Sequence, residues 1–126
     1  MGAVDTNVLV RLFARDDLRQ LAAAEAFIES GAWISHVALA ESMWVLRSNY
    51  RLDHDQLATA INMLLSGRTV TIQDADVVAA ALAQYRQRPS LGFTDCLLLE
   101  IARKTGHLPL GTFDRNLSKL SGAERL

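Results

Sequence analysis

The chain has 126 residues, of which 50% are hydrophobic and 21% are charged, a balance typical of one soluble globular domain. The formal net charge is −1, so bulk charge gives no sign of a nucleic-acid-binding protein. No apolar run approaches the roughly 18 residues that cross a bilayer, and no segment of signal-peptide type opens the chain. The lone Cys96 excludes an internal disulfide. We expect a single domain over residues 1–126, cytoplasmic and without a membrane partner.

Short apolar segments bounded by glycine or polar residues predict strands, and longer Ala/Leu-rich segments with apolar spacings of three and four predict helices. Short strands separated by helices imply right-handed crossovers and parallel pairing. The predicted fold class is therefore α/β, with a central parallel sheet of four or five short strands flanked by helices. In chain order we predict strand Met1–Asp5, helix Leu18–Ser30, strand Trp33–Ser35, helices Val37–Tyr50 and Asp55–Leu65, strand Thr69–Ile72, helices Ala75–Arg86 and Cys96–Thr105, strand Leu108–Leu110, and an edge strand at Ala123–Leu126.

Two aspartates follow predicted strands, and ligands of parallel α/β sheets bind beyond the carboxyl ends of the strands. Asp5 closes the first strand and Asp114 follows the fourth, while Asp95 opens the apolar helix that begins at Cys96. An Asp at the start of a helix can also act as an N-cap that accepts backbone N–H bonds. Each of the three therefore has a functional and a structural interpretation.

Glu41 lies inside a predicted helix that is apolar nearly all round, well beyond any capping position. We expect its carboxylate to be at least partly buried. Burial without a partner costs several kcal/mol or forces protonation, so the side chain needs either an arginine or a metal ion.

Four carboxylates gathered at one end of a sheet would repel one another unless divalent cations neutralised them. Ligands that are all oxygen atoms favour Mg²⁺ or Mn²⁺. Such a cluster suits hydrolysis of phosphodiester bonds, in which one ion lowers the pKa of a bound water and a second stabilises the leaving oxygen. The acids thus indicate a nuclease.

Four segments carry family signatures in a fixed order: Val4–Val10, Ile34–Glu41, Phe93–Leu99 and Gly111–Asp114. In this order and at this spacing, the chain resembles the PIN-domain ribonucleases, and specifically the VapC-type toxins of bacterial type II toxin–antitoxin pairs. The resemblance implies a Mg²⁺-dependent endoribonuclease, with Mn²⁺ as the alternative ion. It also implies a homodimer and a small cognate antitoxin that binds DNA and blocks the acidic site. The implied catalytic and metal-binding residues are Asp5, Glu41, Asp95 and Asp114.

Three further positions are notable in the light of this resemblance. Asn7 and Thr112 match polar residues that support the acids by hydrogen bonding, with turn or capping chemistry as the alternative. Gly92 stands three residues before Asp95, where many members of the family carry a further acid. The geometry of a second metal ion is therefore an open question.

Basic residues follow two of the acids. With the four site acids set aside, 13 basic residues stand against 10 acidic ones, so the rest of the chain carries a charge of about +3. Contact with RNA phosphates and a solvated helix face are the two interpretations of these residues. They are Arg11, Arg15 and Arg19, spaced four apart after Asp5, and Arg115 and Lys119 after Asp114.

Two other functions remain open. A haloacid-dehalogenase-like phosphatase would use Asp5 as a covalent nucleophile, but that chemistry needs a second Asp two residues later, where this chain has Asn7. A metal-free PIN-fold binding module is the other alternative, and the presence of all four acids argues against it.

Overall fold

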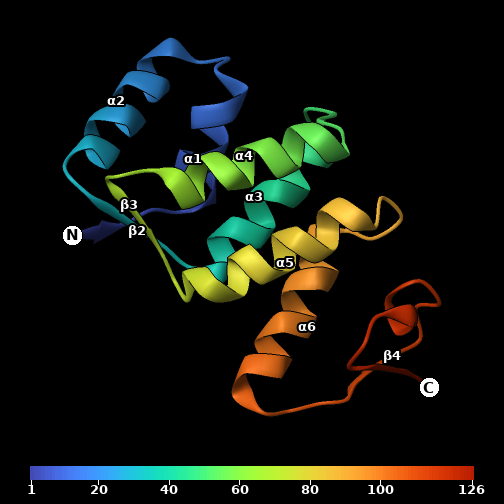
Figure 1. The fold of residues 1–126 in the computed structure, drawn as a ribbon. Coiled ribbons are helices and arrows are strands. Elements are labelled where there is room, and N and C mark those ends of the chain that lie inside the picture. Colours follow the sequence, from blue (N-terminus) through green and yellow to red (C-terminus); the bar gives the residue numbers. More distant parts are fainter. The chain divides into compact units, whose positions relative to one another are not determined.

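The computed structural model describes residues 1–126 and contains six α-helices, one short 3₁₀ helix and five β-strands (Figure 1). By its internal contacts the chain divides into two compact units, Met1–Ala75 and Asp76–Leu126. None of the helices is both long enough and apolar enough to span a membrane.

The first unit is built on a three-stranded parallel sheet in the order β1-β2-β3. Gly2 of β1 lies opposite Ala32 of β2, and Ala32 lies opposite Val70 of β3. Both buried positions of the middle strand β2, Ala32 and Ile34, are fully inaccessible to solvent. The elements of this unit are β1 (Gly2–Ala3), α1 (Thr6–Ala14), α2 (Leu18–Glu29), β2 (Ala32–Ile34), α3 (His36–Ser48), α4 (His54–Ser66) and β3 (Val70–Ile72).

Side-chain caps define where the four helices of this unit begin. Each capping oxygen accepts a hydrogen bond of 2.8 to 3.1 Å from the backbone N–H three residues later. This bond satisfies one of the donors that every helix start leaves without a partner. The capping residues are Asp5 for α1, Asp17 for α2, Ser35 for α3 and Asp53 for α4.

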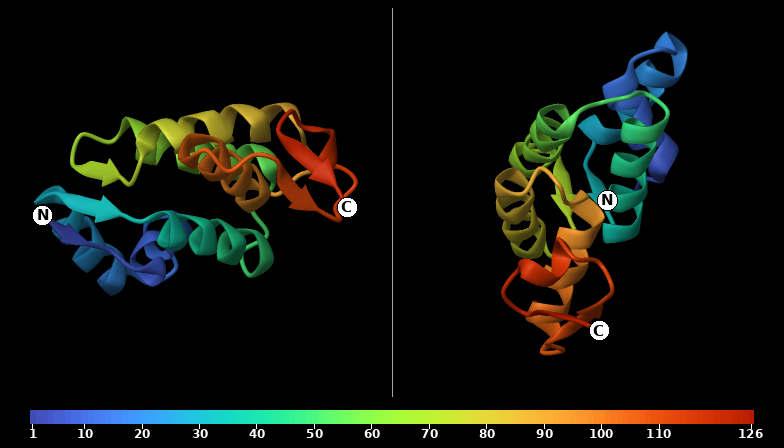
Figure 2. Two further views of the ribbon diagram at one scale, coloured as in Figure 1. Left: turned by 90° about the horizontal axis from the view of Figure 1, so that it is seen from below. Right: turned by 90° about the vertical axis from the view of Figure 1, so that its right-hand side faces the viewer.

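The second unit contains two long helices and a two-stranded parallel sheet. Strand β4 pairs with β5 with Leu110 opposite Ala123, and both strands are seen near the C-terminus in Figure 2. The rings of Tyr85 and Phe93 meet edge to face at 5.9 Å between centroids in the buried interior. The elements are α5 (Ala75–Gln87), α6 (Phe93–Thr105), β4 (Leu110–Thr112), the 3₁₀ helix η1 (Leu117–Lys119) and β5 (Ala123–Arg125).

The α/β class, the five short strands, their parallel pairing and the flanking helices are confirmed. Two details differ from the sequence-based prediction. The strands form separate sheets of three and two strands instead of one central sheet. Strand β4 begins at Leu110, where the prediction placed its end, because Pro109 has no N–H to donate to a ladder and the first bond of the pair runs from Leu110 N to Gly122 O.

The sequence does not predict helix α1. Strand β1 ends at Ala3, and Asp5 caps a helix that begins at Thr6. The apolar residues of this helix continue the apolar stretch that the sequence pattern assigned to the first strand. Arg15 then ends α1 in a left-handed conformation with φ 54°. Arg11, Arg15 and Arg19 therefore belong to one helix, its C-cap and the next helix. The interpretation of these three residues as one solvated helix face is therefore excluded.

Gly106 and Gly92 form a matched pair for testing what fixes the ends of α6. A Cβ at either position meets nothing within 4 Å, but Gly106 has φ 80° whereas Gly92 has an ordinary φ of −77°. We expect Gly106→Ala to lower the free energy of unfolding by about 1 to 2 kcal/mol, because an L side chain is strained in the left-handed region. Gly92→Ala should change it by no more than about 0.5 kcal/mol. Urea denaturation measures both, and equal effects would contradict the backbone argument.

Candidate functional site

Asp5 follows β1 and is exposed at the start of α1. Its Oδ1 atom accepts a hydrogen bond from the backbone N–H of Val8 at 3.1 Å, so the capping interpretation is correct for this residue. A carboxylate has two oxygens, and Oδ2 makes no hydrogen bond within the protein. The cap holds the carboxylate in place and leaves this second oxygen for a ligand.

Glu41 is exposed and makes no ion pair, so the expectation of a buried carboxylate was wrong. The face of α3 that carries Glu41 also carries Val37 and Trp44, which are 74% and 66% exposed. An apolar helix surface therefore faces solvent here, which the sequence pattern could not reveal. The buried acid of this chain is Glu100 on α6, whose carboxylate accepts a hydrogen bond from Arg103 Nε at 3.2 Å.

Helix α3 lies against the beginning of α1 in the first unit. The hydroxyl of the fully buried Ser42 donates to the carbonyl oxygen of Ala38 in its own helix, and its Oγ atom lies 3.4 Å from the carbonyl oxygen of Thr6. Ser42 directly follows Glu41, and Thr6 directly follows Asp5. The two candidate acids of this unit therefore come from adjacent turns of two packed helices.

Asp95 is the third residue of α6 and lies in its first turn, half-buried. The N-cap of this helix is Gly92, which has no side chain, so the capping alternative for Asp95 was wrong. Burial and the nearby negative charge of Asp114 raise the pKa of the Asp95 carboxyl. Asp95 and Asp114 are thus close enough for their charges to interact.

Asp114 is exposed, and its position is set by the loop after β4. The Asp114 backbone N–H donates to Thr112 Oγ1 at 3.0 Å, and its Oδ1 accepts from the N–H of Leu117 at 2.8 Å. Thr112 therefore holds the loop that presents this acid. Asn7 makes no hydrogen bond to any of the four acids, and its supporting role stays a prediction.

Gly92 and Cys96 are the neighbours of Asp95 in the chain that bear on its role. At Gly92, where the family resemblance leads one to expect an acid, an added Cβ would meet nothing within 4 Å. The neighbouring Cys96 is fully buried, and burial, together with the charges of Asp95 and Glu100, raises the pKa of its thiol to about 11. Cys96 is a core residue, as expected, and is not an activated nucleophile.

The carboxylate oxygens of the four candidate acids are the kind of ligand that hard divalent cations prefer. Within either unit, no three side chains of His, Cys, Asp or Glu come together as a metal site. The acids that each unit offers are oxygen donors only, which suits Mg²⁺ or Mn²⁺. In the second unit, burial and the charge of Asp114 both disfavour the ionised form of Asp95, and a bound cation would offset both effects.

The basic residues differ in how far they are already engaged. Arg11 is paired with Asp16, and its NH2 group donates to the Tyr50 hydroxyl at 3.2 Å, while that hydroxyl donates to Asp16 at 3.1 Å. Tyr50 and Asp16 raise the pKa of Arg11. This network ties α1 to the segments after α1 and α3. Arg15, Arg115 and Lys119 are exposed and make no ion pair.

One feature near Asp5 was missed by sequence reasoning. A cavity of about 370 Å³ lies between α1 and α2 and is lined by Asp5, Asn7, Arg11, Gln20 and Phe27, among others. The only signal in the sequence is Phe27, the one aromatic residue in an Ala-rich helix. Periodicity alone does not say that its ring lies beside Asp5.

The fold and the acids together define an α/β protein with carboxylates at the ends of parallel strands. Over residues 3–123 the chain matches the PIN domain family, so it belongs to that family. PIN domains are a family of nucleases and typically bind a divalent metal ion. No curated protein matches the chain.

The raised pKa of Asp95 has a consequence for stability. The folded state holds the Asp95 proton more tightly than the unfolded state does. Protonated Asp95 therefore contributes fully to the free energy of unfolding below the unfolded pKa, and this contribution is lost as pH rises through the folded pKa. We expect Asp95→Asn to be more stable than the parent at about pH 7 and to lose this advantage at about pH 3. Asp114→Asn should lower the pKa of Asp95 in an NMR titration.

Asp76→Asn is the control of opposite sign. A hydrogen bond from Lys104 at 3.0 Å lowers the pKa of Asp76, so this carboxylate stabilises the fold at neutral pH. The variant should be less stable than the parent at about pH 7. Thermal melts across pH measure all three proteins. A pH-independent effect of Asp95→Asn would contradict the raised pKa of Asp95, and an Asp95 pKa unchanged by Asp114→Asn would contradict the interaction with Asp114.

Proposed function

We propose that the protein is a Mg²⁺-dependent endoribonuclease that acts as the toxin of a toxin–antitoxin pair. Membership of a nuclease family supports the first part, and the resemblance of the four signature segments to VapC-type toxins supports the second. The single observation that carries the proposal is the position of Asp95, a half-buried carboxylate that caps nothing and lies near the charge of Asp114.

Asp5, Glu41, Asp95 and Asp114 are the proposed metal-holding and catalytic residues, with Mn²⁺ as the substitute ion. When bound, the metal would supply an activated water and would stabilise negative charge on the departing oxygen. The chain's own contribution is to fix the acids. The α1 cap holds Asp5, and Thr112 with the Leu117 N–H holds Asp114. That both pairs serve one centre is part of the proposal.

Exposed cations would bind the phosphates of the RNA on either side of the cleaved bond. Arg15 follows α1. Arg115 precedes η1 and Lys119 is its last residue, one residue and five residues after Asp114. None of the three is engaged in an ion pair, so each can pair with a phosphate without giving up an existing contact. Arg11 remains a candidate, but a phosphate would have to compete with Asp16.

The proposed partners are a second copy of the chain and a small DNA-binding antitoxin that blocks the acids. The exposed Val37 and Trp44 on α3 support association with another protein surface, because large apolar side chains that lie together are typical of interfaces. Exposed carboxylates without a metal would attract a cationic side chain of the antitoxin. A small gene directly upstream that encodes a DNA-binding fold would support the toxin assignment.

The alternatives are a phosphatase and a metal-free binding module. Membership of the PIN family argues against the phosphatase. The binding module differs from the proposal in one measurable respect, since it would bind RNA or protein without any metal-dependent cleavage.

Cleavage of RNA should require Mg²⁺ or Mn²⁺ and should fall at least about 100-fold in Asp5→Asn. Asparagine caps a helix as well as aspartate does, so this variant removes the charge and keeps α1. A fluorogenic RNA assay measures cleavage, and circular dichroism checks the fold.

Asp53→Asn is the matched control for Asp5→Asn. Asp53 is also an N-cap, with a 2.8 Å bond from the Gln56 N–H, but it belongs to the capping box of α4. Its activity should equal that of the parent. Full cleavage in EDTA, or an Asp5→Asn variant as active as the parent, would contradict the metal mechanism.

Arg15→Ala should change the salt dependence of RNA binding, whereas Arg11→Ala should change the thermal stability. Loss of a phosphate contact by Arg15 reduces the slope of log affinity against log salt by about 0.7 for single-stranded RNA, and the melting temperature stays unchanged. Arg11→Ala should mainly lower the melting temperature, because it leaves Asp16 and Tyr50 without their cation. Binding isotherms at several salt concentrations and thermal melts separate the two effects. The reverse assignment of effects would contradict this division.

A further inference from the structure

The cavity between α1 and α2 has the dimensions of a subsite for a small, flat group. Its volume is about 370 Å³, near the lower end of the range for pockets that hold small molecules. Asp5 lies in its wall, so a group bound here would be a direct neighbour of a proposed metal-holding carboxylate. Small residues of α2, Ala23 and Ala24, leave the space that larger side chains would fill.

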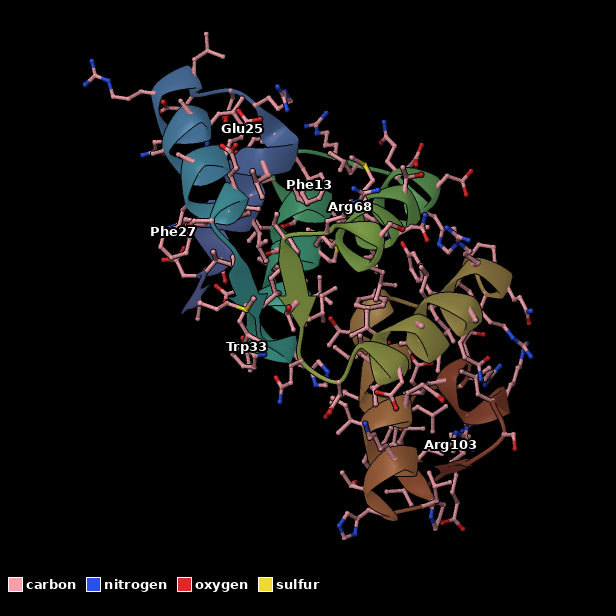
Figure 3. The ribbon with its side chains drawn as sticks, turned by 60° about the vertical axis from the view of Figure 1, so that its left-hand side comes forward. Phe13, Glu25, Phe27, Trp33, Arg68 and Arg103 are labelled. Atoms are coloured by element: carbon pink, nitrogen blue, oxygen red, sulfur yellow. The ribbon has the colours of Figure 1, made fainter.

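The Phe27 ring provides a rigid aromatic wall. Its tip points at Gly2 of β1: a Cβ added to Gly2 would come within 2.6 Å of the ring's terminal carbon and 3.4 and 3.5 Å of the two adjacent carbons. Only glycine allows this approach without displacing the ring. Because the ring meets Gly2 with its tip, its faces are not covered by that contact, and the residue is 45% exposed. Figure 3 shows Phe27 beside the N-terminal strand.

Two carboxamides face the cavity from different helices. Asn7 lies on α1 and Gln20 on α2, and both are exposed. Neither side chain makes a hydrogen bond within the protein, since Gln20 is bonded to Asp17 only through its backbone N–H. The Nε atom of Arg11, also in this wall, is buried without a partner. The cavity thus combines an aromatic wall with unused donors and acceptors.

We infer that this cavity binds one unpaired base of the RNA substrate, adjacent to the phosphate at the acidic site. Single-stranded RNA is recognised by stacking of bases on aromatic rings and by hydrogen bonds to their edges. Phe27 supplies the stacking surface, and Asn7 and Gln20 supply the edge contacts. The inference rests on the proposed nuclease function and adds a determinant of substrate choice. The unused amides of Asn7 and Gln20, which can read the edge of a base, favour a nucleotide over an apolar protein segment.

A double-mutant cycle between protein and RNA tests the subsite. The probe is a fluorescein-labelled single strand of about 12 nucleotides, intact or with one abasic position moved along the strand, and binding is measured by anisotropy in EDTA. Phe27→Leu keeps an apolar contact with Gly2 but removes the aromatic face. We expect it to weaken binding of the intact strand by about 5- to 150-fold. It should have no further effect on the strand whose abasic position coincides with the subsite.

Control variants separate stacking from general damage to the fold. Phe27→Tyr should bind like the parent, and so should Leu18→Ala, which removes an exposed apolar residue of the same helix that does not line the cavity. Gln20→Ala should keep most of the affinity for a homopolymer but reduce the difference in affinity among the four bases.

The outcomes distinguish this inference from the proposed function. If Phe27→Leu weakens the intact and every abasic strand equally, or weakens none, while the parent cleaves RNA with Mg²⁺, the subsite is overturned and the nuclease stands. Unchanged RNA binding by every Phe27 variant would show that the ring is not a stacking surface for RNA, which also overturns the subsite. A parent protein that neither binds nor cleaves RNA overturns both.

Discussion

Each helix that follows a strand in the first unit needs a hydrogen-bond acceptor for the N–H groups of its first turn, and the rest of the structure depends on how this need is met. The connections are short, since only Val4 and Asp5 separate β1 from α1 and only Ser35 separates β2 from α3. A polar side chain directly after the strand solves the problem, as Asp5 does after β1 and Ser35 after β2. The same geometry presents the carboxylate of Asp5 at the carboxyl end of the sheet, where ligands of parallel folds bind. One residue thus serves both the fold and the proposed chemistry.

In the second unit the acid at the start of a helix is not its cap. Asp95 caps nothing, and its half-buried position beside Asp114 is unfavourable for its charge. A carboxylate that makes a helix start less stable has no structural purpose that the contacts reveal, which is the argument for a functional one. Gly92, one turn before Asp95, adds no carboxylate here, although a Cβ at this position would meet nothing within 4 Å. With fewer charges at the helix start, the repulsion that the fold has to tolerate is smaller.

Exposed apolar side chains lie at two places in the first unit, each beside one of its candidate acids. Val37 and Trp44 share a face of α3 with Glu41, and Phe27 lies over Gly2 in the wall of the cavity beside Asp5. The carboxylates of Asp5 and Glu41 are exposed, so one ligand can contact an acid and the apolar surface beside it at the same time. The apolar surroundings and the acids therefore act in the same direction. Both favour ligands that combine flat apolar groups with charge, as nucleotides do.

The sequence by itself determined the fold class, five of the six α-helices and the parallel character of the strands, because hydrophobic periodicity reports local structure and strand length limits the connections. It also identified the family, because four short signature segments from different helices and strands occur in the family's order and spacing. Only the tertiary structure decided which faces are covered. Glu41 was expected to be buried and Glu100 was not considered, because an apolar helix does not show which of its sides packs against a neighbour. Helix α1 was missed because its apolar residues continue those of β1, and only the Asp5 bond to Val8 separates the two. The cavity between α1 and α2 depends on a contact between Phe27 and Gly2, residues 25 positions apart, which no local pattern can encode.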